Sequence, residues 1–176
     1  MTRTSLADRI RLERRSSFVG REAELARLAG AFEERGPVMS LVVGLGGMGK
    51  SSLLDAFAER LGEQGIRVLR VDCRAVEPTS AGLLSALGQL LGAALSSPQD
   101  LAETLTPLGP RLALAFDHYE AFRILDGWLR QQLLPPLPSS VRVFACARSA
   151  PIEAWTADPG WGKLVQIIRL GPLDEV

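Results

Sequence analysis

The sequence predicts an α/β domain in which a parallel sheet is covered by helices on both faces. Five short apolar runs alternate with longer segments in which apolar residues recur at the spacing of a helix. The runs are continuously apolar, which is typical of strands that are buried on both faces of a sheet. With 176 residues, 47% of them hydrophobic, the chain is long enough for one domain with a substantial core.

The N-terminal part of the chain predicts an arm followed by a helix. Residues 1–17 are charged and only weakly periodic, so we expect an arm, with the domain itself covering residues 18–176. A helix is expected next, and it ends at Gly36-Pro37. This helix places four apolar residues on one face: Leu25, Leu28, Ala29 and Phe32.

A phosphate-binding motif follows the first apolar run, residues 38–43. Eight residues satisfy the pattern G-x-x-x-x-G-K-[ST] in full: Gly44, Leu45, Gly46, Gly47, Met48, Gly49, Lys50 and Ser51. The four glycines let the backbone curl tightly, so that several N–H groups converge on phosphate. The motif leads through Ser51 and Ser52 into a helix expected over residues 51–61, whose positive N-terminal dipole favours an anion.

The residue types in this motif assign individual roles. Lys50 would reach the terminal phosphates of a nucleoside triphosphate, and the Ser51 hydroxyl would ligate magnesium. The alternative is a glycine-rich strand-to-helix turn that matches the pattern by chance. Because a strand precedes the motif and an amphipathic helix follows it, the sequence favours a nucleotide-binding site.

The rest of the chain supplies the remaining elements. Strands are expected over residues 66–71, 111–116, 141–146 and 165–169, and helices over residues 80–95 and 120–134. The helix over residues 80–95 is apolar around more than half of its circumference, so it is either covered by the domain or partly faces a partner. Residues 96–110, with three prolines, are expected to form a loop that contains a helical turn.

Two acidic residues follow the third strand. Asp117 comes directly after Phe116, at the sheet edge where ligands of α/β proteins collect, and its carboxylate would hold magnesium. Glu120 would start the next helix and polarise the attacking water. The alternatives are a helix cap for Asp117 and an ordinary first-turn acid for Glu120. His118, the only histidine, is expected to be a bystander at the mouth of the site.

One arginine and two cysteines lie at the ends of other strands. Arg148 follows the fourth strand and would read the terminal phosphate through charge-assisted hydrogen bonds, or else be a surface arginine. Cys73 and Cys146 have apolar surroundings, which favours buried core residues over a disulfide or a metal site.

The overall charge bears on the classes of partner. Twenty acidic and twenty basic residues cancel, so we expect neither direct nucleic-acid binding by this domain nor attraction to an anionic membrane. No apolar stretch approaches the roughly 18 residues that a membrane span requires, and no leader is recognised. We therefore expect a cytoplasmic protein.

Four features, taken in this order, resemble the STAND class of signal-transduction ATPases, relatives of AAA+ proteins that include the NB-ARC and NACHT groups. They are residues 18–22, the phosphate loop, residues 115–120, which resemble a Walker B motif with its catalytic acid, and residues 146–148. The resemblance implies a P-loop NTPase fold of the ASCE type, a three-layer α/β/α sandwich whose five-stranded parallel sheet has the order 2-3-4-1-5. It also implies that ATP or ADP and Mg²⁺ are the cofactors.

The resemblance also assigns a role to the residues before the first helix. Val19, Gly20 and Arg21 would form the adenine and ribose side of the pocket. On the residues alone, the same segment equally predicts a turn and a helix cap. Cys146 and Ala147 depart from the family, which usually has small hydroxyl residues there, so we expect no hydrogen bonding from them.

The function that the resemblance implies is an ATP-dependent switch with slow hydrolysis, acting on a downstream helical lid and effector domains. The chain stops after residues 170–173, where such proteins continue into the lid, so we expect an excised domain or a natural minimal form with weak affinity and little turnover. One alternative is a ring-forming AAA+ motor or loader that oligomerises with nucleotide, in which Arg123 or Arg130 serves a neighbour's site. Another is a scaffold that keeps nucleotide without turnover.

Overall fold

The computed structural model describes residue 6 and residues 20–109, 111–150 and 153–172. The expected arm over residues 1–17, apart from residue 6, lies outside the described residues, as does Val19. Within the described ranges, no helix is both long enough and apolar enough to cross a membrane.

A five-stranded sheet forms the centre of the domain. The strands are β1 (Met39–Val43), β2 (Arg67–Asp72), β3 (Leu112–Asp117), β4 (Val141–Ala147) and β5 (Val165–Arg169). Their order in the sheet is β2-β3-β4-β1-β5, and all four pairings are parallel. The predicted strands, their direction and their order are confirmed.

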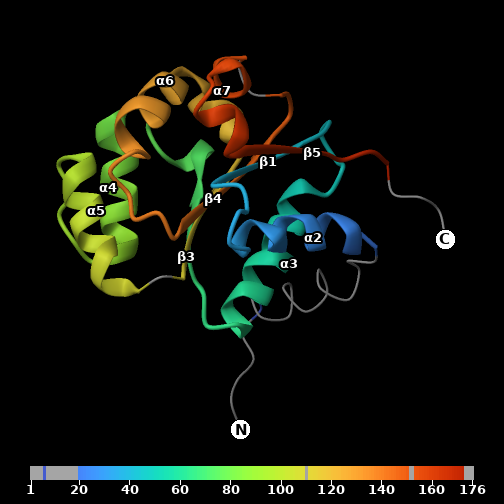
Figure 1. The fold of residues 1–176 in the computed structure, drawn as a ribbon, viewed down its shortest axis with the longest axis horizontal. Coiled ribbons are helices and arrows are strands. Elements are labelled where there is room, and N and C mark those ends of the chain that lie inside the picture. The colour runs from blue at the N-terminus through green and yellow to red at the C-terminus, as the bar shows by residue number, and fades with distance from the viewer. Residues whose placement is uncertain (1–5, 7–19, 110, 151–152, 173–176) are drawn as a thin grey trace, which may run out of the picture.

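Helices cover both faces of this sheet, and Figure 1 shows α2 and α3 on one side and α4 and α5 on the other. The α-helices are α2 (Glu22–Ala29), α3 (Lys50–Glu63), α4 (Ser80–Leu91), α5 (Pro98–Leu105), α6 (Asp126–Trp128) and α7 (Ala154–Ala157). Two buried apolar clusters fill the spaces between the layers. The three-layer α/β/α sandwich is therefore confirmed.

The middle strand β3 shows how side-chain size shapes the two interfaces. Leu112, Leu114 and Phe116 belong to the cluster on the α4 and α5 side, whereas Ala113 and Ala115 belong to the cluster beneath α2 and α3. Successive side chains of a strand point to opposite faces, so the small alanines all face α3. This lets the helix that follows the phosphate loop lie close to the sheet.

Two helices differ from the expectation at their ends. α2 gives way to a 3-10 turn, Gly30–Phe32, which buries Ala31 and leaves Ala29 exposed. α4 ends at Leu91 and is capped by Gly92, whose φ of 69° lies in the left-handed region that favours glycine. Most of the apolar face of α4 is covered by the domain, while Leu90 is 44% exposed.

The loop expected over residues 96–110 contains a full helix, α5. Ser97 caps it: the Ser97 hydroxyl accepts from the Asp100 N–H at 3.1 Å, and the Asp100 carboxylate accepts from the Ser97 N–H at 3.0 Å. Pro98 occupies the first helical position, where proline is well tolerated. The sequence Ser97-Pro98-Gln99-Asp100 contains this capping pattern. A loop was expected instead because the segment contains three prolines.

The helix expected over residues 120–134 is irregular. It begins as a 3-10 helix, Tyr119–Leu125, continues as α6, and ends as a π-helix, Leu129–Leu133. Tyr119, Phe122 and Leu125 are all buried, and their spacing of three puts them on one face of a 3-10 helix. The Tyr119 hydroxyl also donates a hydrogen bond to the buried carboxylate of Asp126.

The two cysteines of the chain are both described, buried and free. Cys73 follows β2 and Cys146 lies on β4, with β3 between these strands. Burial, the largest cause, raises the pKa of the Cys73 thiol to about 12, and burial raises the pKa of Cys146 as well. Their expected role as core residues is confirmed.

Candidate functional site

The phosphate loop joins β1 to α3 at the carboxyl edge of the sheet. Gly47 and Gly49 have φ values of 82° and 78°, in the left-handed region that favours glycine. Gly49 is the N-cap of α3, and the first turn of this fully described helix carries no acidic residue. Backbone N–H groups and the positive end of the helix dipole are thus available to an anion.

The other two glycines of the loop do not have left-handed backbone. A Cβ at Gly44 would lie 3.0 Å from the carbonyl oxygen of Leu170 and 3.2 Å from its Cβ, so a side chain here would fit tightly against the chain after β5. Gly46 has no atom within 4 Å of such a Cβ. Only Gly47 and Gly49 are required by the curl of the loop.

Lys50 and Ser51 project from the first turn of α3. The Lys50 ammonium donates to the carbonyl oxygens of Gly44 and Leu45, at 2.7 and 2.8 Å. An ammonium has three donors, so one N–H remains for a phosphate oxygen. Ser52 is exposed in the same turn, and Leu45 and Met48 complete the loop.

Asp117 meets the phosphate-loop helix directly. It ends β3 with 4% of its surface exposed, and its Oδ1 accepts from the Ser51 hydroxyl at 3.0 Å and from the His118 N–H at 2.9 Å. The two predicted magnesium ligands, 66 residues apart in the chain, are therefore in contact.

The oxygen donors at this point fit magnesium. In the described part of the chain, no group of three or more His, Cys, Asp or Glu side chains could hold a metal alone. Mg²⁺ binds hard oxygen ligands and commonly shares them with substrate phosphates and water. A hydroxyl and a carboxylate beside a phosphate loop match this requirement, and Ser51 and Asp117 are the residues that would hold the ion.

Glu120 and Arg148 are also brought together. Arg148 Nε lies 3.3 Å from Glu120 Oε1, although the Arg148 side chain is 69% exposed. The second oxygen, Glu120 Oε2, is buried and has no hydrogen-bond partner among the described residues. One carboxylate oxygen is thus paired with the arginine, and the other is left as an acceptor.

Arg148 lies beside the start of the phosphate loop. Ala147 pairs with Val43 across β4 and β1, and its carbonyl accepts from the Gly44 N–H at 3.2 Å. The Cys146 thiol donates to the Lys50 carbonyl with an Sγ–O distance of 3.6 Å. The expectation that Cys146 offers no hydrogen bond is therefore wrong, because β4 passes directly under the first turn of α3.

The two arginines considered for a neighbour's site both bind within their own chain. Arg123 donates to the Ser149 hydroxyl at 2.7 Å and to the Ala150 carbonyl at 3.2 Å. It therefore holds the loop that follows Arg148. Arg130 forms an ion pair with Asp158 at 3.1 Å.

Gly20 and Arg21 lie across the end of β5. The Arg21 guanidinium donates to the Gly171 carbonyl at 2.6 Å and to Glu24 at 3.0 Å, and Arg21 itself is left-handed with a φ of 70°. The adjacent Leu170 is the residue that contacts Gly44. The segment is thus near the phosphate loop, and its contact with adenine or ribose stays a prediction.

Sequence reasoning did not foresee which ionisable groups surround Asp117. Arg70 of β2 donates to Asp117 Oδ2 at 3.1 Å and pairs with Asp55 of α3. His118 Nδ1 lies 3.3 Å from Asp72 Oδ1 and 3.4 Å from Asp117 Oδ1. Arg70, one of two arginines in the run over residues 66–71, was a signal that could have been used.

Asp72 shows that the sheet edge is strongly charged. It pairs with Asp117 across β2 and β3, so two carboxylates end neighbouring strands. Hydrogen bonds from the Arg74 side chain, the largest cause, lower the pKa of Asp72 to about 2. Asp72 is therefore ionised at neutral pH.

Comparison with known proteins agrees with this fold. The family model described as AAA ATPase domain matches residues 17–145, and no curated protein matches the sequence. The solved structure of Cdc6p from Pyrobaculum aerophilum superposes with a TM-score of 0.65 at 17% identity, covering 88% of this chain and 46% of that one.

Two further solved structures are similar to this chain to about the same degree. A chain of Drosophila ORC bound to DNA gives a TM-score of 0.68 at 20% identity, covering 93% of this chain and 46% of that one. The Aeropyrum pernix ORC2 protein gives a TM-score of 0.63 at 15% identity, covering 86% of this chain and 48% of that one. This chain spans less than half of each of these three chains, and such identities show the fold alone. Because the family match covers well over half of the sequence, the chain belongs to the AAA ATPase domain family.

Proposed function

We propose that this chain is the nucleotide-binding domain of a STAND-type, ATP-dependent molecular switch that hydrolyses ATP slowly. The observation that carries the proposal is the ion pair between Arg148 and Glu120 beside the phosphate loop. A terminal phosphate at this place would compete with Glu120 for the arginine. Nucleotide would thereby make different contacts in two states, as a switch requires.

Each residue of the site has a role in this proposal. Lys50 and the loop N–H groups bind the phosphates, and Ser51 and Asp117 hold magnesium, which would neutralise charge that develops on the phosphate oxygens. Glu120 Oε2, buried and unpaired among the described residues, accepts a hydrogen bond from the attacking water. Arg148 contacts the terminal phosphate.

The domain limits and partners belong to the same proposal. Residues 18–176 form the nucleotide-binding domain in the cytoplasm, and a helical lid and effector domains are its partners in a longer protein. A net charge of zero supports the absence of direct nucleic-acid binding by this domain. Unchanged anisotropy of labelled duplex DNA on addition of the chain would agree with this; a saturable rise would contradict it.

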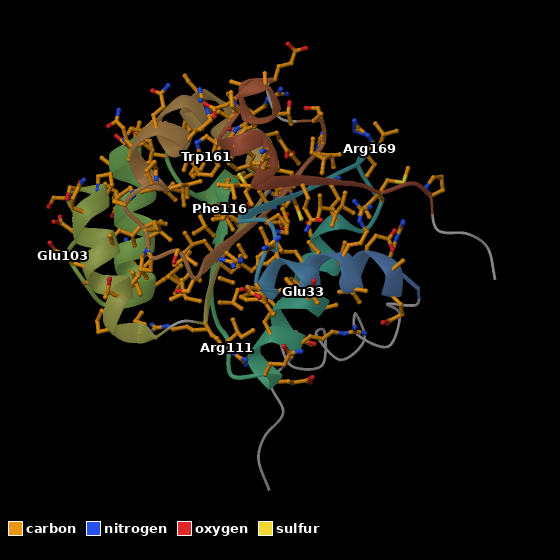
Figure 2. The ribbon with its side chains drawn as sticks, in the orientation of Figure 1. Glu33, Glu103, Arg111, Phe116, Trp161 and Arg169 are labelled. Carbon is orange, nitrogen blue, oxygen red and sulfur yellow. The ribbon has the colours of Figure 1, made fainter. Side chains whose placement is uncertain are left out.

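Calorimetry with Mg-ATP and Mg-ADP tests the proposal. We expect wild type to bind ATP more tightly than ADP, and Arg148→Ala to reduce this ratio of affinities by about 1.4- to fivefold, since exposed ion pairs contribute about 0.2–1 kcal/mol. Arg111→Ala is the matched control, because Arg111 lies at the opposite end of β3 from Phe116 (Figure 2). No heat from Mg-ATP or Mg-GTP with a folded sample would contradict nucleotide binding.

A second candidate function is a ring-forming AAA+ motor or loader, which membership of the AAA ATPase domain family favours. The DNA-bound Drosophila ORC is one of the similar structures. Size-exclusion chromatography separates the two candidates. A monomer in the nucleotide-free, ADP and ATP states supports the switch, and a nucleotide-dependent hexamer supports the ring.

A further inference from the structure

Arg70 bridges the strand that carries Asp117 and the helix that carries Ser51. It lies on β2 with its side chain 38% exposed. One guanidinium nitrogen, Nη2, is 3.1 Å from Asp117 Oδ2, and the other, Nη1, pairs with Asp55 Oδ1. A planar guanidinium can contact two acids at once, which an ammonium on a flexible stem does less well.

The two oxygens of Asp117 are held by different groups. Oδ1 accepts from the Ser51 hydroxyl and the His118 N–H, whereas Oδ2 accepts from Arg70. Among the described residues, Arg70 makes the only hydrogen bond to Oδ2. The plane of the carboxylate is therefore fixed by Arg70, and Oδ1 is kept toward Ser51.

Asp55 removes an electrostatic objection to this arrangement. A lone guanidinium beside a magnesium site would repel the metal ion. Asp55 lies one helical turn after Ser51 on α3, and its carboxylate offsets the charge of Arg70. Asp117, Arg70 and Asp55 together carry one net negative charge, which favours a cation.

We propose that Arg70 is a positioning residue, which holds Asp117 in the orientation that magnesium-bound nucleotide requires. The inference rests on the proposed nucleotide-binding function. If Arg70 only stabilised the fold by pairing a strand with a helix, its loss would not change the effect of magnesium on nucleotide affinity. A positioning role predicts that this effect does change. Groups that orient metal ligands typically contribute about 10- to 100-fold to metal affinity.

Titration with fluorescent N-methylanthraniloyl-ATP, in magnesium and in EDTA, tests the proposal. We expect Arg70→Met to reduce the gain in affinity on adding magnesium by about tenfold, the low end of the usual range because the phosphates also hold the ion. Its affinity in EDTA should stay within about twofold of wild type. Arg67→Met is the matched control, because Arg67 is the first residue of β2 and Asp72, its last, lies beside Asp117. It should leave the affinities in magnesium and in EDTA unchanged.

Each result has a defined meaning. A magnesium gain in Arg70→Met within about twofold of wild type overturns the proposal, as does an equal loss of affinity with and without magnesium. Thermal unfolding of the nucleotide-free variants checks that they fold. If Arg70→Met does not fold, Arg70→Lys decides: it keeps the charge but loses the bridge, so we expect about a threefold smaller gain, and an unchanged gain overturns the proposal. If the wild-type protein binds the fluorescent nucleotide neither in magnesium nor in EDTA, the proposed function itself is contradicted.

Discussion

Replacing Glu120 by Gln is expected to keep ATP affinity within about twofold of wild type while slowing hydrolysis about 10²- to 10⁴-fold, the usual contribution of a positioned general base. Glutamine has the shape of glutamate, but its amide cannot take a proton from water. The buried Oε2 of Glu120 has no hydrogen-bond partner among the described residues, so it is the atom available to that water. Because turnover should be slow, hydrolysis is measured in a single turnover with the chain in excess over labelled ATP.

Glu103→Gln is the matched control for this substitution. Glu103 is exposed on α5, and Figure 2 shows it at the outer side of this helix, far from Phe116 at the end of β3. The Glu103→Gln variant should hydrolyse ATP at the wild-type rate. Equal rates for wild type and Glu120→Gln would remove the catalytic role and favour a scaffold that keeps nucleotide without turnover.

Replacing Lys50 by Ala is expected to weaken ATP binding by about 1.5–3 kcal/mol, the usual contribution of a hydrogen bond to a charged group. This corresponds to a Kd about 10- to 150-fold higher, measured by calorimetry with Mg-ATP. The physical reason is the loss of the ammonium that the carbonyls of Gly44 and Leu45 hold over the loop. The same contacts brace the loop, so thermal unfolding is measured in parallel.

Lys163→Ala is the matched control for Lys50→Ala. Lys50 and Lys163 are the only lysines among the twenty basic residues, and Lys163 is exposed in the 3-10 turn Trp161–Lys163. The control should bind ATP as wild type does. ATP affinity that survives in a folded Lys50→Ala variant would show that phosphate does not bind at this loop.

The predictable part of the fold was local in the sequence. The five strands were located from short apolar runs, which in β1, β3 and β4 reflect burial on both faces of the sheet. The two edge strands are less regular, since β2 exposes Arg67 and Arg70 and β5 exposes Arg169. The order of the strands came from the family resemblance and not from the residues themselves. The helix over residues 120–134 was expected to be regular, yet Tyr119, Phe122 and Leu125 have the spacing of three that suits a 3-10 helix.

The predictable part of the site was also local. Asp117 was assigned to magnesium from its place after β3; the structure places it in contact with Ser51, and its binding of magnesium stays a prediction. The contact between Arg148 and Glu120 was not predicted, although each residue had been singled out. Arg70 was missed because its partner, Asp117, lies 47 residues away on the neighbouring strand.

The sequence by itself determined the conformation of the phosphate loop, because left-handed backbone at Gly47 and Gly49 depends on the residues at those positions. Apolar spacing also located the five strands and the helices α2, α3 and α4. Only the tertiary structure decided which charged side chains share the carboxyl edge of the sheet. In a parallel sheet each neighbouring strand is reached through a long crossover connection, so the partners of Asp117 and Glu120 are set by strand order and register.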